Sequence, residues 1–396
     1  MGLGLYLHGD CDRQRDALLE EIREHVRQTH SEILLSSRIG LNEAGHRALW
    51  LSLHPAEEEV ELSALGLSRL VASARTSGAG PGYHAFVCDL LDELGKKFSV
   101  RWQGIDPTGE TGDETGYFHD RDRAKLEAEM RGWLRGVAQT LAGSDLVGVA
   151  MSMPVDAPVY EVPGVVTALG PRDCAWWKRV ADDDAAAREF FAWWEPGTGA
   201  GYYLGRAMCR MWCDVCWREP RTDEEREVHE EVLELLRRAH ELEPQRPLPV
   251  SAWAELLALR SEATPEGLVD AGTGTIGYRR GSMLAHPFPG ATIRIPGPFS
   301  TAYDKKGNWS AWEDGRTVWA SLVTATKLKE GGAVPQDEPE PRHETTEEDG
   351  DVMHKVFGKR VRRDGEMMRA LFVSIVFTSK QHVEWAKETY RSAVLE

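Results

Sequence analysis

The sequence of 396 residues lacks the segments that direct a chain into or across a membrane. Its first residues, MGLGLYLHGDCDRQ, do not place a basic run before a long apolar run, as a secretory signal does. No apolar run elsewhere approaches the length of a membrane span. Cysteine is scarce, with six in the chain, and a long chain without an export signal usually keeps its cysteines as free thiols. We therefore expect a cytoplasmic protein with no membrane partner.

Basic residues are also in short supply. The chain has 47 lysines and arginines against 64 aspartates and glutamates, which gives a formal net charge of −17. Such a surface repels nucleic acid and anionic lipid, and it attracts a positively charged partner. Fourteen tryptophans need cores or interfaces to bury them. The composition thus favours a multidomain soluble protein that binds a basic protein and is unlikely to bind nucleic acid.

The familiar catalytic motifs are missing. There is no Gly-x-Ser-x-Gly elbow, no phosphate-binding loop ending in Lys-Ser or Lys-Thr, and no dinucleotide fingerprint. His229 and Glu230 begin a zinc-protease pattern, but residue 233 is Leu233, so the second histidine is absent. The sequence therefore predicts no catalytic residue and no cofactor. Because catalytic groups can assemble from distant positions, whether the protein is an enzyme stays open.

The first predicted domain, residues 1–170, alternates strand and helix patterns and is expected to be α/β or α+β. Asp12 is a plausible N-cap of its first helix, and Gly95 is the expected end of another. The pattern does not say whether the sheet is parallel. Strands are expected at 3–9, 46–55, 99–102 and 145–153, and helices at 12–30, 60–75, 84–98 and 122–143.

The second predicted domain, residues 171–262, is helical throughout. Residues 239–256, AHELEPQRPLPVSAWAEL, resemble the link between successive tetratricopeptide helices, in which Ala-x-x-Leu-x-Pro precedes Ala-Trp. The resemblance covers this one junction, so it implies a helical hairpin and not a repeat array. The helices are expected at 183–194, 201–217, 222–243 and 251–260, the third of them with a capping box formed by Thr222 and Glu225.

The third predicted domain, residues 263–396, is rich in strand patterns and ends in a helix. We expect an antiparallel α+β domain, which makes the whole protein an α+β multidomain chain. An acidic, proline-rich insertion at residues 330–352 is expected to be a solvated loop or disordered. A basic strand follows it at 354–363. This strand could contact a polyanion, but an exposed edge strand is the preferred interpretation.

Three cysteines, Cys209, Cys213 and Cys216, have the spacing C-x-x-x-C-x-x-C. This spacing resembles the cluster motif of radical S-adenosylmethionine enzymes, in which three thiolates bind three irons. That family places the motif in a loop after an early strand, with a glycine-rich segment behind it. Here the motif lies past mid-chain in an expected helix, where the same spacing puts three small buried residues on one face. Core packing is therefore preferred over an iron cluster or a zinc site.

Residues 76–84, TSGAGPGYH, form the best glycine-rich loop. Gly78, Gly80, Gly82 and His84 could surround an anion at the start of a helix. The segment before the loop is expected to be a helix, so a turn between two helices is the preferred interpretation.

An acidic run from Asp113 to Asp122 contains His119, Asp120 and Asp122, which could bind a divalent cation. Acidic residues also cap the helix that follows, and the run satisfies no fixed metal-ligand spacing. A metal- or nucleotide-dependent enzyme that uses this run and the glycine-rich loop is the main rival hypothesis.

The hairpin NWSAWEDGRTVW places Trp309, Trp312 and Trp319 beside Asp314. Tryptophans next to acidic residues are plausible contacts for a basic partner, although the rings could instead fill a core. We expect a non-enzymatic binding or regulatory protein, immunity-like or inhibitor-like, with these four residues as interface candidates. Its partner and its oligomeric state are beyond what the sequence predicts.

Overall fold

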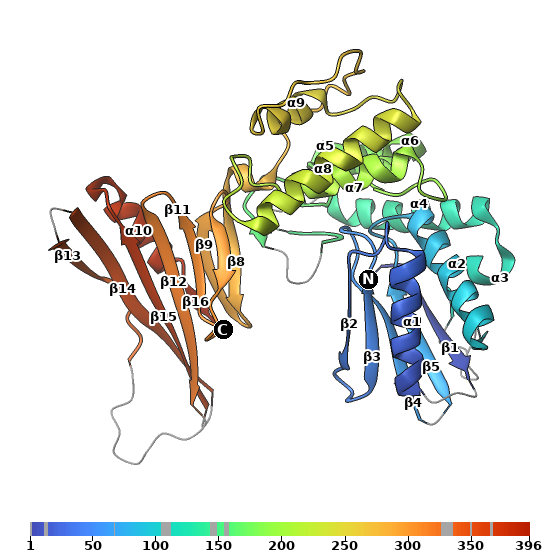
Figure 1. The fold of residues 1–396 in the computed structure, drawn as a ribbon, viewed down its shortest axis with the longest axis horizontal. Coiled ribbons are helices and arrows are strands. Elements are labelled where there is room, and N and C mark those ends of the chain that lie inside the picture. The colour runs from blue at the N-terminus through green and yellow to red at the C-terminus, as the bar shows by residue number, and fades with distance from the viewer. Residues whose placement is uncertain are drawn as a thin grey trace. The chain divides into compact units, whose positions relative to one another are not determined.

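The computed structural model describes residues 2–11, 15–66, 68–103, 112–142, 149–153, 158–325, 336–348, 351–364 and 367–396. The chain divides into two compact units. Unit 1 comprises Met1–Val155, Val162–Asp214 and Val228–Ile276, and unit 2 comprises Asp156–Glu161, Val215–Glu227 and Gly277–Glu396. An N-terminal sheet, a helical middle and a C-terminal sheet that ends in a helix confirm the predicted α+β class (Figure 1). The predicted division into three domains stays a prediction.

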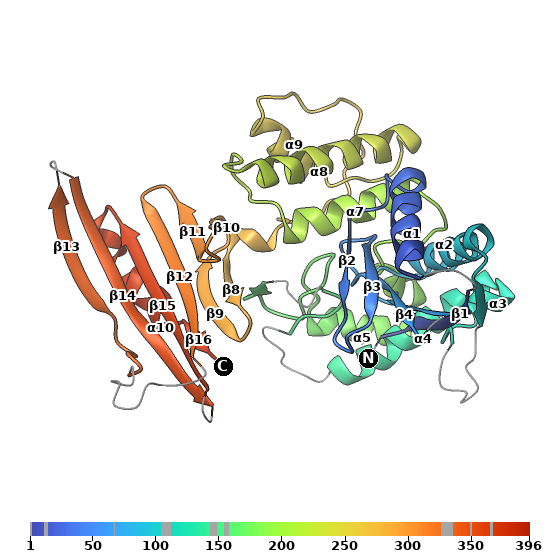
Figure 2. The same cartoon turned by 60° about the horizontal axis from the view of Figure 1, so that its bottom comes forward.

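Unit 1 begins with a sheet formed by β1 (Gly4–Asp10), β2 (Ser36–Leu41), β3 (Arg47–Ser52), β4 (Val60–Leu65), β5 (Arg69–Arg75) and β6 (Arg101–Gln103). Its strand order is β2-β3-β4-β5-β1-β6, and every neighbouring pair is antiparallel. Helix α1 (Arg15–Thr29) packs on β2, β3 and β4. It also contacts α2 (Pro81–Phe98), which packs on β6 (Figure 2).

The prediction of a helix at 60–75 is wrong, because this segment forms β4 and β5. Three successive residues are buried in each strand, Leu62–Ala64 and Leu70–Ala72, so both faces of these strands are covered there. The two strands pair through a turn at Gly66, whose φ of 52° lies in the left-handed region. The glycine-rich loop at 76–84 therefore follows a strand, and the expected turn between two helices is also wrong.

The predicted end of a helix at Gly95 is wrong as well. Helix α2 continues through Gly95 and ends at Ser99, which takes the left-handed conformation with φ 57°. A Cβ on Gly95 would lie 2.9 Å from the backbone oxygen of Val100 and 3.0 Å from the ring of Trp102. Glycine is needed here for close packing rather than for a cap. The predicted N-cap Asp12 lies outside the described residues, as does most of the strand expected at 145–153.

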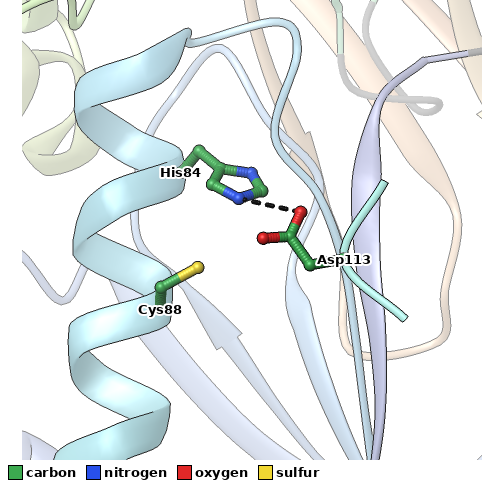
Figure 3. Close-up of side chains that lie close together, drawn as sticks. All are labelled: His84, Cys88 and Asp113. Atoms are coloured by element: carbon green, nitrogen blue, oxygen red, sulfur yellow. Dashed lines mark ion pairs between the residues drawn. The ribbon is translucent and has the colours of Figure 1, made fainter. Parts of the chain in front are cut away.

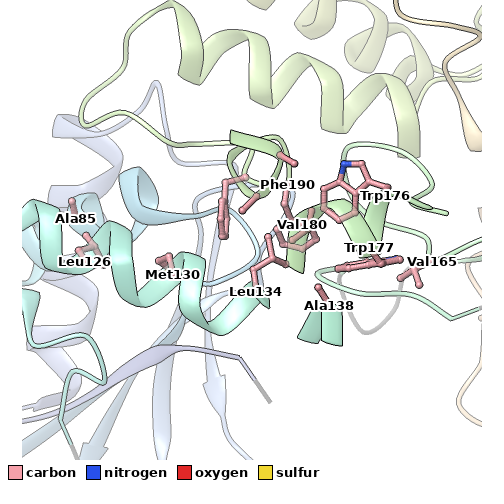
Figure 4. Packing of buried hydrophobic residues seen from close by; sticks show 13 residues of the cluster. Ala85, Leu126, Met130, Leu134, Ala138, Val165, Trp176, Trp177, Val180 and Phe190 are labelled. Carbon is pink, nitrogen blue, oxygen red and sulfur yellow. The ribbon is translucent and has the colours of Figure 1, made fainter. Parts of the chain in front are cut away.

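Three of the remaining helices of unit 1 share a second hydrophobic core (Figure 4). Helix α4 (Arg123–Leu141) begins at the capping side chain of Asp122, which accepts a hydrogen bond from the backbone N–H of Lys125. Its apolar face packs against α5 (Cys174–Asp182), α6 (Asp184–Arg188) and the chain that follows them. The other helices in this part are α3 (Tyr117–Asp120), α7 (Ala200–Cys213), α8 (Asp223–Leu242) and α9 (Val250–Ala258).

Two predicted helices of this region are shorter in the structure. The helix expected at 183–194 stops at Arg188, because Phe190, Phe191 and Trp193 are all buried and need packing on every side rather than on one helix face. The helix expected at 201–217 ends at Cys213. None of the described helices is both long and apolar enough to span a bilayer.

Unit 2 contains two antiparallel sheets. Their strands are β7 (Val159–Tyr160), β8 (Ser282–Phe288), β9 (Ala291–Pro296), β10 (Ser300–Tyr303), β11 (Trp309–Glu313), β12 (Arg316–Ala325), β13 (Arg342–Glu348), β14 (Asp351–Asp364), β15 (Met367–Phe377) and β16 (Val394–Leu395). The strand orders are β10-β11-β12-β15-β14-β13 and β16-β9-β8-β7. Helix α10 (Val383–Arg391) packs on β14 and β15, and short 3₁₀ turns lie at Tyr278–Arg280 and Lys380–His382.

The acidic insertion at 330–352 is only partly described, and its second half corrects the prediction of a loop. Residues 342–348 form β13, which pairs with β14 along its whole length. Thr345 and Thr346 favour extended backbone, and β14 offers a long strand on which β13 can pair. The basic strand 354–363 is therefore an internal part of the sheet and not its edge, because β14 lies between β15 and β13.

Candidate functional site

The glycine-rich loop binds an anion, but the anion belongs to the chain itself. The carboxylate of Glu57 accepts hydrogen bonds from the backbone N–H groups of Gly78 and Ala79, the latter at 2.9 Å. Burial raises the pKa of Glu57 to about 7, although the two amides favour its charged form. The backbone groups that an external phosphate or carboxylate would need are thus already occupied.

Gly80 and Gly82 serve packing rather than ligand binding. The N–H of Gly82 donates to the backbone oxygen of Trp193 at 2.9 Å, and the N–H of Trp193 donates to the oxygen of Ala79 at 2.8 Å. A Cβ on Gly82 would lie 2.4 Å from the backbone oxygen of Glu195, and one on Gly80 would clash with the ring of Phe191. The loop therefore anchors residues 191–195.

His84, one turn into α2, belongs to a buried network centred on Asp113 (Figure 3). Its Nε2 lies 3.2 Å from Oδ1 of Asp113 and 3.1 Å from Oγ1 of Thr115, and its Nδ1 lies 2.8 Å from Oγ1 of Thr76. Asp113 also accepts from the backbone N–H groups of Thr115 at 2.8 Å and Phe118 at 2.6 Å. Burial alone would raise the pKa of Asp113, but the bonds to His84 and the two amides hold it well below its usual value.

Cys88 faces the same network from the next turn of α2 (Figure 3). Among the described residues, His84, Cys88 and Asp113 are the one group of such side chains close enough to hold a metal ion, with ligand atoms within 4.8 Å of one another. Burial and the nearby charge of Asp113 raise the pKa of the Cys88 thiol well above its usual value. Both ring nitrogens of His84 already have partners, so a metal would have to break these bonds first.

The other candidate ligands of the acidic run, His119, Asp120 and Asp122, have partners outside this network. Asp120 forms an ion pair with Lys125 at 2.9 Å, and Asp122 caps α4. The ring of His119 packs edge-on against Phe118. The residues that sequence reasoning grouped as one cation site thus have separate structural roles, while the group that the fold does assemble takes His84 and Cys88 from α2.

The three clustered cysteines do not all lie on one helix face, although the sequence predicts that they do. Cys209 and Cys213 belong to α7, whereas Cys216 follows the end of that helix. Burial raises the pKa of all three thiols, that of Cys216 to about 11 and the other two further. A metal that bound here would have to displace the thiol protons, because the thiolate is the binding form. The iron cluster stays untested.

An open cleft of about 780 Å³ lies within unit 1, and no sequence motif predicts it. Its floor is one face of α7, whose lining residues recur every three or four positions. Residues 191–195 form one wall, held between the glycine-rich loop and Gly205 of α7. Residues 169–172 and 271–276 complete the cleft. The floor consists of Gly201, Leu204, Gly205, Met208 and Trp212.

Three arginines line the cleft, although the unit that contains it is acidic. Arg188 pairs with Glu195 at 2.8 Å, and Arg172 donates to the backbone oxygen of Glu189 at 3.1 Å. Arg246 donates from Nε to Glu243 at 2.7 Å, and no described residue accepts a hydrogen bond from either of its Nη atoms. These two atoms lie 3.6 and 3.8 Å from the point where a Cβ on Gly201 would stand. The cleft thus combines an apolar floor with a guanidinium fork that can bind an anion.

The interface candidates in unit 2 lie on two faces of one hairpin. Trp309 is buried and pairs with Ala320, whereas Trp312 and Trp319 lie on the opposite face and are partly exposed. Asp314 sits exposed at the turn and pairs with Arg221 at 2.7 Å. Trp309 is therefore a core residue, as the alternative interpretation expected, and the remaining three stay predicted contacts for a partner.

Comparison of the chain with known proteins identifies no relative, so the functional conclusions below depend on the geometry of the structure. No protein-family model matches the chain, and searches against curated proteins and against solved structures give no significant match.

Proposed function

We propose that this protein is a binding protein rather than a catalyst, and that the cleft of unit 1 holds its ligand. The observation that supports this most is the position of Arg246, whose Nη atoms stand unpaired among the described residues beside an apolar floor. A site of about 780 Å³ has the size of a small-molecule pocket. Its ligand would have a flat apolar body against Met208 and Trp212, and a carboxylate, phosphate or sulfonate on Arg246.

The binding of 8-anilinonaphthalene-1-sulfonate, an aromatic ring system with one sulfonate, tests this proposal. We expect one molecule to bind per chain, with a rise in its fluorescence. The variant Arg246→Gln should weaken binding about tenfold, because it removes one charge-assisted contact. Gly201→Leu should weaken it further by filling the space next to the guanidinium.

Controls separate the cleft from nonspecific adsorption. Arg27→Gln removes an arginine of α1 whose side chain is 59% exposed, and it should leave binding unchanged. Competition by an aromatic carboxylate, by a nucleoside monophosphate and by inorganic phosphate identifies the preferred anion. Equal binding by wild type, Arg246→Gln and Gly201→Leu would contradict the proposal, as would absence of binding by the wild type.

A second candidate function is recognition of a basic protein partner in the cytosol, as an immunity-type or inhibitor-type protein would do. The observation that favours it is the distribution of charge. Unit 1 has 40 acidic and 26 basic residues, a net charge of −14, whereas unit 2 has 24 acidic and 21 basic residues, a net charge of −3. A cationic protein would therefore dock on unit 1 and be steered there at low salt.

Affinity capture from a native lysate tests this second function, provided that the captured protein is then purified and titrated. We expect an equimolar complex with a partner rich in lysine and arginine, whose affinity falls as salt rises. Lysine substitutions of exposed Glu43 and Glu266 in unit 1 should weaken it, and the matched change of exposed Glu347 in unit 2 should not. An acidic partner, or an affinity that salt leaves unchanged, would count against this function.

A further inference from the structure

Strand β13 forms an edge of the larger sheet in unit 2 among the described strands. It pairs with β14 from Arg342 opposite Phe357 to Glu348 opposite Asp351, and no described strand lies on its other side. The side chains from Arg342 to Glu347 are all exposed. Edge strands are usually protected by proline, a bulge or charged side chains. Strand β13 has no proline and no bulge, and its charges have both signs, so they repel a strand of one charge but not one of complementary pattern. Its outer N–H and C=O groups are therefore available for another strand.

The sequence of β13, RHETTEE, is complementary to itself in the antiparallel direction. When two copies pair about a two-fold axis at Thr345, Arg342 stands opposite position 348, which is glutamate in the sequence, and His343 stands opposite Glu347. Both pairs occur twice because of the symmetry. Opposite charges at directly paired positions of neighbouring strands stabilise a sheet.

The register of this pairing is specific. A two-fold axis normal to the sheet places one residue opposite the same residue of the second copy. The symmetric pairing can therefore be shifted only by moving the axis from one residue to the next. Moving it to Glu344 places two glutamates opposite each other, and moving it to Thr346 places Glu344 opposite the glutamate at 348. Thr345 is the one centre near the middle of β13 that pairs opposite charges and places no glutamate directly opposite another.

We propose that two copies of this chain associate through β13, so that their two six-stranded sheets become continuous. The occupant of the edge is a second copy because the charge pattern of β13 matches itself. This association uses unit 2 alone and is independent of the ligand and partner proposed above for unit 1. Because it joins only one strand from each copy, we expect a weak dimer whose affinity falls with salt.

A cysteine at the two-fold axis gives the sharpest test. Residues paired across antiparallel strands have Cα atoms about 4.5–5.5 Å apart, which a disulfide can bridge. Thr345→Cys in full-length protein should therefore form a disulfide-linked dimer under mild oxidation. Exposed Cys174 is changed to serine in the background, because it is a free thiol that could react on its own.

Thr346→Cys is the matched control, because residue 346 faces Glu344 of the second copy and not itself. The two cysteines would then stand diagonally, about 7–8 Å apart, beyond the range of a disulfide. We expect Thr345→Cys to crosslink at least about tenfold faster. Equal rates at the two positions, or no crosslink at 345, would overturn the proposal.

Charge reversal tests the pairing a second way, by sedimentation of the full-length protein over a range of concentrations. Arg342→Glu and Glu348→Arg should each lower the dimer fraction, and the double variant should restore it because the charges are exchanged. Lys305→Glu, at an exposed position of unit 2 away from β13, should leave it unchanged. Singles that match wild type, or a double variant that restores nothing, would overturn the proposal.

Discussion

Unit 1 gathers polar side chains in two places, and the two places differ in what satisfies their hydrogen bonds. Around the first turn of α2, Glu57 accepts hydrogen bonds from two backbone N–H groups of the glycine-rich loop, Asp113 accepts from two further backbone N–H groups, and His84 is bonded at both ring nitrogens. In the cleft, Arg246 keeps two donors unpaired among the described residues. The histidine and the carboxylate of the network thus serve the fold through their hydrogen bonds, while the less conspicuous arginine carries the ligand site that we propose.

The largest expected effect is on the buried network. Asp113→Ala leaves His84 and two backbone N–H groups without their acceptor, and we expect the free energy of unfolding to fall by about 3–5 kcal/mol. Urea denaturation at pH 7 measures it. Cys88→Ala, next to the network, should cost about 1 kcal/mol for the lost sulfur atom. Comparable losses for the two variants would show that Asp113 is not central to the network.

The buried carboxyl group of Glu57 should make the stability of the protein depend on pH. Its pKa is raised to about 7 in the folded protein, from an ordinary 4.5, so the folded state binds the extra proton between these values. The stability that this proton provides is present below pH 4.5 and is lost as pH rises through 7. The loss should reach about 3 kcal/mol for this one group.

Glu57→Gln should remove this dependence, since an amide keeps an acceptor for Gly78 and Ala79 but does not titrate. The measurement is the difference between wild type and variant in urea denaturation at pH 5 and pH 7.5. Parallel curves for the two proteins across this range would contradict the raised pKa of Glu57.

A substitution of Gly82 tests whether the glycine-rich loop supports the wall of the cleft. Gly82→Ala would push a methyl group to within 2.4 Å of the backbone oxygen of Glu195, so we expect a loss of about 1–3 kcal/mol and weaker ligand binding, because the cleft wall must move. Gly132→Ala is the matched control on α4, where a methyl group meets nothing within 4 Å. It should stabilise the protein by about 0.5–1 kcal/mol. Thermal unfolding of both variants checks the contrast in sign.

Local sequence patterns predict much of the fold, and the wrong predictions have physical causes. The hairpin around Asp314 and the helix that ends unit 2 were predicted because period and turn residues agree there. The segment 60–75 is rich in Leu and Ala, which favour helices, yet it forms two strands that are partly buried on both faces and so lack a clear alternating pattern. Strand β13 looked like a solvated loop because its stability comes from pairing with β14, which no local pattern records.

The cleft could not be predicted for a different reason. Its walls come from residues 169–172, 191–195 and 271–276, and Arg246 reaches it from beyond α8. Only the floor has a local signal, since Leu204, Met208 and Trp212 share one face of α7. The opposite face of that helix is buried too, so the sequence does not tell a core face from a cleft face. The network around Asp113 could not be predicted for a similar reason, because Asp113 and His84 come together only in the tertiary fold.

The smallest effect on stability is expected for Glu195→Gln. This variant removes a carboxylate from the cleft wall, as Asp113→Ala removes one from the network. Its partner is Arg188, and both side chains are more than half exposed, at 55% and 53%. Solvent screens such a pair, so the free energy of unfolding should change by less than about 0.5 kcal/mol. Ligand binding should respond in the opposite way, because Arg188 loses its partner and adds an unpaired cation to the cleft. If Glu195→Gln binds the aromatic sulfonate more tightly at unchanged stability, the charges of the cleft wall act on the ligand and not on the stability of the fold. Unchanged binding would restrict the recognition of the anion to Arg246.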